Sequence, residues 1–71
     1  MYFVVHLPNQ TTVTSNTFAP ADQPQVKSLL KKAAAGELTY LAVDKRDGET
    51  AIIGKELLVQ STYTISKPDN A

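Results

Sequence analysis

The first residues of the chain form a short apolar run with the composition of a β-strand. Residues 2–7 are rich in aromatic and β-branched side chains and end at Pro8. Residues 11–15 favour a strand again after a polar turn near Asn9. The pattern therefore predicts an N-terminal β-hairpin. One of its faces is expected to carry the apolar residues Phe3, Val5, Leu7 and Val13.

The middle of the chain has the spacing of an amphipathic helix. Asp22 suits the N-cap, and Gln25 completes a capping-box pattern three residues later. Pro24 lies in the first turn, where its missing N–H costs no hydrogen bond. Gly36 predicts the C-terminal end. The apolar stripe that would pack on a sheet consists of Val26, Leu29, Leu30, Ala33 and Ala34.

The second half of the chain predicts three further strands. They cover residues 38–44, 49–53 and 62–65. Asp47 and Gly48 lie between the first two of them, and this dipeptide readily takes the positive φ that a tight hairpin needs. Between the last two, residues 55–58 predict a short helical turn.

These elements define an α+β domain with the order ββαβββ. We expect two layers, a small antiparallel or mixed sheet with one helix packed on one face. We expect a single domain over residues 1–66 and a flexible C-terminal tail at residues 67–71. Residues 16–23 connect the hairpin to the helix, and Phe18 is expected to lie under the helix start.

One helix covers only one face of such a sheet. The opposite face would carry Tyr2, Val4, Tyr40 and Ala42, which are then free to contact a partner or a second copy of the chain. The alternative is that the sheet curls toward a barrel and buries these residues itself. An exposed edge strand could also accept a strand from a partner.

Composition narrows the class of protein. A chain of 71 residues buries only about 60 % of the surface that its unfolded form exposes, less than larger domains do, and this one has no cysteine and a single histidine. Disulfides and metals are thus excluded as stabilisers, and self-association, for example as a homodimer, remains. No secretory leader or membrane span is recognisable, so we expect a cytoplasmic protein. Its general style is that of a small bacterial or phage protein.

No arrangement typical of a catalytic, cofactor or metal site is present. His6 has no acidic neighbour in sequence that could orient it as a general base. The segment from Gly48 to Lys55 lacks the spacing and the Ser or Thr of a phosphate loop. Asp44, Asp47 and Glu49 supply too few oxygen ligands for calcium. We expect a protein that is not an enzyme.

Seven basic and seven acidic side chains leave no net charge, which argues against a dedicated nucleic-acid-binding protein. The leading hypothesis is a small non-catalytic protein-interaction module that uses Tyr2, Val4 and Tyr40. The alternative is a nucleic-acid-binding regulator, provided that the helix end and the second hairpin lie together. Its basic patch would consist of Lys27, Lys31, Lys32, Lys45 and Arg46.

Overall fold

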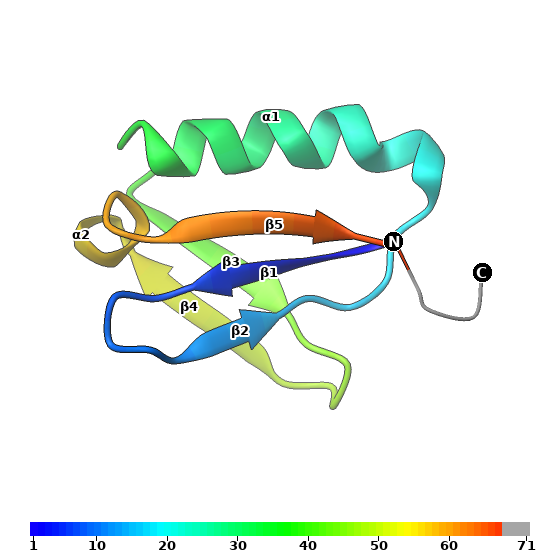
Figure 1. Cartoon of the computed structure of the whole chain (residues 1–71), viewed down its shortest axis with the longest axis horizontal. Coiled ribbons are helices and arrows are strands. Elements are labelled where there is room, and N and C mark those ends of the chain that lie inside the picture. Colours follow the sequence, from blue (N-terminus) through cyan, green and yellow to red (C-terminus); the bar gives the residue numbers. More distant parts are fainter. Residues whose placement is uncertain (68–71) are drawn as a thin grey trace.

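The computed structural model, which describes residues 1–67, contains five strands, one long helix and a one-turn helix (Figure 1). The α+β class and the element order of the sequence prediction are confirmed. Of the predicted tail at residues 67–71, residues 68–71 lie outside the described part of the chain. In chain order the elements are β1 (Tyr2–His6), β2 (Thr12–Thr14), a 3-10 turn η1 (Pro20–Asp22), α1 (Gln23–Ala34), β3 (Tyr40–Asp44), β4 (Thr50–Gly54), α2 (Lys55–Leu58) and β5 (Thr62–Ser66).

The strands divide between two antiparallel sheets, where the sequence analysis expected one. A three-stranded sheet has the order β2-β1-β5, and the β3–β4 hairpin forms a separate two-stranded sheet. Figure 1 shows the three-stranded sheet in front of the two-stranded one. The sheets meet at one corner, where Ser15 bridges to Lys45 and the Asn16 N–H donates to the Asp44 carbonyl at 2.7 Å.

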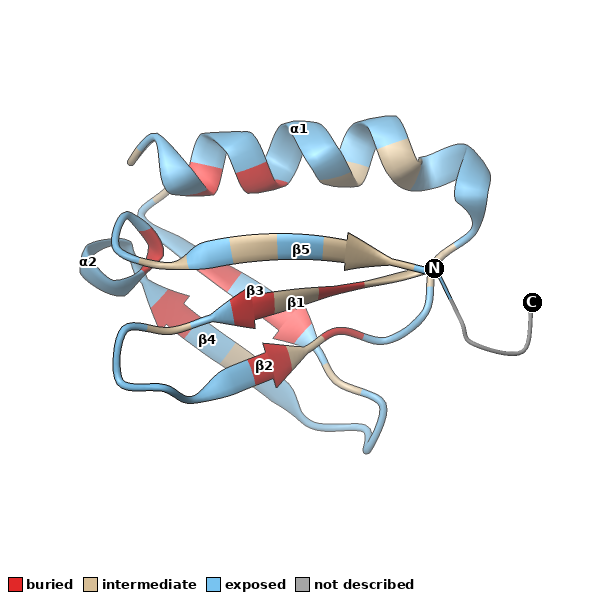
Figure 2. Cartoon of the chain, viewed as in Figure 1, coloured by how far each residue is buried: buried red, intermediate tan, exposed pale blue. Residues whose placement is uncertain are grey.

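The core lies between the two sheets. Its residues alternate along the strands as predicted, so that each sheet turns its apolar row inward (Figure 2). Phe18 is partly buried against this core. The buried hydrophobic residues are Phe3, Val5 and Val13 from the first hairpin, Leu41, Val43 and Ile53 from the second, Leu30 and Ala33 from α1, and Leu58 from α2.

Helix α1 packs on the margin of the sheets, where it contacts β5 and α2 (Figure 1). Its buried stripe is narrower than predicted. Leu30 and Ala33 are buried and Val26 is half-buried, whereas Leu29 is 38 % exposed and Ala34 is exposed. A helix that covers a full sheet face would bury all five. Because α1 lies at the margin, only the side of the helix that points between the two sheets is buried.

The two ends of α1 differ in how well local sequence predicted them. The predicted capping box is wrong, because the Asp22 side chain makes no capping hydrogen bond. Asp22 is the last residue of η1 and already has a helical backbone (φ −88°, ψ −3°). The C-terminal end is confirmed. Gly36 has φ +80°, and the Glu37 N–H donates to the Lys32 carbonyl, as in a Schellman motif.

Both hairpin turns place one residue at positive φ. Gly48 has φ +86°, as the Asp-Gly dipeptide predicts, and the Lys45 N–H donates to the Glu49 carbonyl at 2.8 Å. In the first hairpin Gln10 has φ +69°, and the Thr11 N–H donates to the Asn9 side chain at 3.1 Å. The Asn9 side chain therefore supports a turn in which a non-glycine residue carries the strained conformation.

Leu58 is expected to be critical for stability, because it is fully buried between α2 and the strands (0 % exposed). Leu58→Ala should lower the free energy of unfolding by about 2–5 kcal/mol, the usual cost of removing a buried leucine. The measurement is urea unfolding. The matched control is Leu57→Ala at the neighbouring residue, 40 % exposed, which should cost much less. Equal losses in the two variants would contradict the assignment of Leu58 to the core.

Candidate interaction surfaces

The structure separates the three residues predicted to bind a partner. Tyr2 and Val4 lie on the outer face of the three-stranded sheet and are half-buried. Tyr40 lies on the outer face of the β3–β4 hairpin and is 58 % exposed. Because the strands belong to two sheets that pack face to face, these outer faces are different surfaces. A single binding face made of all three residues does not exist.

Tyr2 is partly covered by the chain itself. The Arg46 guanidinium lies over its ring, with the Arg46 Cζ atom 4.8 Å from the ring centroid. Such a cation–π contact contributes about 0.5–1 kcal/mol at an exposed site. It also places the tip of the second hairpin against β1. Tyr2 is thus engaged within the molecule and is less available for a partner than Tyr40.

The outer face of the β3–β4 hairpin carries an exposed apolar group, here called the β3–β4 outer patch and defined by Tyr40, Ala42 and Ile52. Ile52 is 70 % exposed and pairs across the strands with Ala42. Tyr40 pairs with Gly54, which has no side chain to cover the ring. The sequence analysis did not single out Ile52. Its opposite parity to Ile53 in the strand was the signal that could have identified it.

The five basic residues of the nucleic-acid hypothesis form two groups. Lys27, Lys31 and Lys32 lie on α1, whereas Lys45 and Arg46 lie at the tip of the second hairpin. Strand β3 runs away from the C-terminal end of α1, so the tip lies at the other end of the molecule (Figure 1). Five strand residues span about 17 Å. At the tip, Lys45 also pairs with Asp47, with 3.8 Å between Nζ and Oδ2.

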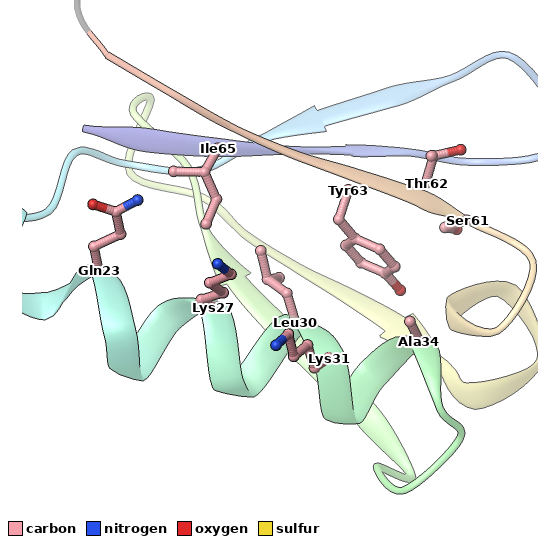
Figure 3. Close-up of a pocket in the computed structure, with 9 residues that line it drawn as sticks. All are labelled: Gln23, Lys27, Leu30, Lys31, Ala34, Ser61, Thr62, Tyr63 and Ile65. Carbon is pink, nitrogen blue, oxygen red and sulfur yellow. The ribbon is translucent and has the colours of Figure 1, made fainter.

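A groove runs between α1 and β5. Its volume is about 560 Å³, it is open to solvent, and its lining is mainly apolar. Figure 3 shows side chains from both elements converging on it. Sequence reasoning missed this groove, because it exists only once β5 has paired with β1. The lining residues are Gln23, Lys27, Leu30, Lys31 and Ala34 on one side, and Ser61, Thr62, Tyr63 and Ile65 on the other.

Tyr63 connects the wall of this groove to α2. Its hydroxyl donates a hydrogen bond to the Leu58 carbonyl at 2.7 Å. This carbonyl belongs to the last residue of α2, and it also accepts a longer hydrogen bond, at 3.3 Å, from the Ser61 N–H. Burial raises the pKa of the Tyr63 hydroxyl above its ordinary value of 10.0, because the ionised form is poorly solvated there.

His6 lies on the outer face of the three-stranded sheet and is exposed. Its Nε2 atom is 3.2 Å from the Thr64 Oγ1 atom, and its cross-strand neighbours are Thr12 and Thr62. Within residues 1–67, no three histidine, aspartate or glutamate side chains gather in a group that could hold a metal ion. In the same part of the chain, the helices are all too short or too polar to span a membrane.

Comparison with protein-family models, curated proteins and solved structures finds no match for this chain. Two surfaces of the molecule are therefore the candidates for a function, the β3–β4 outer patch and the groove between α1 and β5.

Tyr63→Phe should remove the hydrogen bond to Leu58 and lower stability by about 0.5–1.5 kcal/mol at neutral pH. In the wild type the folded state holds the phenol proton to a higher pH than the unfolded state does. Stability should consequently fall as the pH rises past about 10, and the variant should lack this contribution. Urea unfolding at about pH 7 and about pH 11 measures both effects.

The control for this prediction is Tyr40→Phe, which removes the hydroxyl of an exposed tyrosine. It should leave stability at neutral pH nearly unchanged. A Tyr63→Phe variant with the same stability and the same pH dependence as the wild type would disprove the role assigned to this hydroxyl.

Proposed function

We propose that the chain is a non-catalytic protein-interaction module that associates with a second copy of itself through the β3–β4 outer patch. The observation that carries this proposal is the exposure of Ile52 and Tyr40, at 70 % and 58 %, at diagonal positions of one hairpin face. Single exposed apolar residues are common on soluble proteins, whereas neighbouring large ones on a strand surface are typical of interaction sites.

The small size of the domain supports a second copy as the partner. A chain of 71 residues without cysteine has little apolar surface to bury on its own. A two-fold symmetric pairing would bring each patch onto its own copy, so one set of residues suffices for both sides of the interface. The centre of the patch, at Ala42 and Ile52, is uncharged, and Asp44 lies at its end on the same face of β3.

The nucleic-acid alternative has less support. A compact basic patch would contact several phosphates at once and release their counterions. Here the lysines on α1 and the basic residues at the hairpin tip lie at different ends of β3. Arg46 is in addition engaged with Tyr2, and Lys45 with Asp47. The exposed apolar side chains of the β3–β4 outer patch suit contact with a protein, whereas a polyanion would need basic side chains that lie together.

Ile52→Lys should abolish self-association, because two copies would then bring like charges into an apolar contact. Sedimentation velocity over a concentration series up to about 1 mM measures this. The wild type should approach twice the monomer mass of 7.7 kDa, and the variant should remain at the monomer mass.

The matched control is Leu29→Lys, which introduces the same charge at an exposed leucine on α1. This variant should dimerise as the wild type does. Circular dichroism of each variant checks that the fold is intact. A wild type that stays monomeric throughout, or an Ile52→Lys variant that still dimerises, would reject the proposed interface.

A further inference from the structure

Strand β5 is an edge strand, and the direction of its backbone groups follows from the pairing of β1. The Phe3 N–H donates to the Ser15 Oγ atom, and the Phe3 carbonyl accepts from the Ser15 N–H, each at 2.9 Å. The backbone of Phe3 therefore points toward the β2 side. Because neighbouring residues in a strand point their backbone groups to opposite sides, Val4 points toward β5.

The pairing register shows which backbone groups of β5 point toward β1 and which point away from it. Val4 lies opposite Thr64, so the backbone of Thr64 points toward β1. The backbone N–H and C=O groups of Tyr63 and Ile65 must then point away from the sheet, toward the groove beside α1. Within residues 1–67, no hydrogen bond outside the strand ladders reaches these groups. A row of unpaired strand groups is a template for one more strand.

The groove offers such a strand an apolar wall. Leu30 and Ala34 of α1 face Tyr63 and Ile65 of β5 across it (Figure 3). Its volume of about 560 Å³ is within the range of pockets that bind small ligands, and it is open to solvent, so a peptide can extend beyond it. Peptides that bind by strand addition use main-chain hydrogen bonds for affinity and alternate side chains for specificity.

The charges on the groove indicate which peptide fits. Lys27 and Lys31 are the charged members of its lining, which contains no acidic residue. Among the residues that the structure describes, the one ion pair joins Lys45 to Asp47, so neither groove lysine is paired there. Two lysines four helical residues apart are separated by about 6 Å along the axis. Alternate residues of a strand are separated by nearly the same distance, about 6.6 Å.

We propose that the groove between α1 and β5 binds an extended acidic peptide segment of a partner protein. The peptide adds to the free edge of β5 through Tyr63 and Ile65. Two of its carboxylates, on alternate residues, pair with Lys27 and Lys31. This site is distinct from the β3–β4 outer patch, and it operates whether or not the protein dimerises.

The first test uses an acetylated and amidated peptide of alternating valine and glutamate, about eight residues long. It is titrated into ¹⁵N-labelled protein and followed by NMR. Chemical-shift changes should concentrate in α1 and β5, and hydrogen exchange at the Tyr63 and Ile65 amides should slow. Changes confined to other elements, or unaltered exchange at these two amides, would overturn the proposal.

The second test addresses charge. The double variant Lys27→Glu with Lys31→Glu should weaken peptide binding at least tenfold, or about 1.4 kcal/mol. Its matched control is Lys32→Glu, which reverses a lysine of the same helix that does not line the groove and should change binding little. A peptide with glutamine in place of glutamate should bind weakly to the wild type. Equal affinities throughout would reject the lysine–carboxylate pairing.

The third test addresses the backbone. N-methylation of the peptide at one set of alternate amides removes the hydrogen bonds to β5 and should abolish binding, whereas methylation at the other set should be tolerated. A peptide that binds equally well with either set methylated does not add as a strand. The Ile52→Lys variant should bind the peptide like the wild type, which separates this site from the proposed dimer interface.

Discussion

The rest of the structure depends on the hydrogen bonding of β1 along both of its edges. β2 occupies one edge through the N-terminal hairpin, and β5 occupies the other, which brings the two ends of the described chain together. With both edges of β1 filled, the β3–β4 hairpin packs across the sheet, and its backbone hydrogen-bonds to the first hairpin at one corner, at the Ser15–Lys45 bridge and between Asn16 and Asp44. The core forms between the two sheets because this packing brings their apolar rows face to face.

This arrangement also creates the two candidate surfaces. When β5 pairs with β1, its outer edge is left beside α1, and the groove follows from that placement. When the second hairpin packs by its inner face, its outer face with Tyr40 and Ile52 is left to solvent. Core and groove share residues: Leu30 belongs to the core and lines the groove, and Tyr63 and Ile65 pack against the core and also line the groove.

The separation of roles is visible in neighbouring residues. In β4, Ile53 is buried in the core and Ile52 is among the most exposed apolar residues of the described chain. In α2, Leu58 is fully buried and Leu57 is not. The two residues of each pair have the same chemical character, so hydrophobicity alone could not divide them. Strand and helix periodicity determined in part which residue of each pair is buried, and tertiary packing determined the rest.

Local sequence determined the elements of this protein: the two hairpins, the helix that ends at Gly36 and the turn at Gly48, because backbone conformation at these positions depends on a few adjacent residues. It did not determine the start of α1, where a 3-10 turn replaced the capping box at Asp22. Tertiary structure alone decided that β5 pairs with β1 and that the two hairpins lie in separate sheets, and with that the separation of Tyr2 from Tyr40 and the groove. The physical reason is that pairing between distant strands depends on how all the apolar faces can be buried at once.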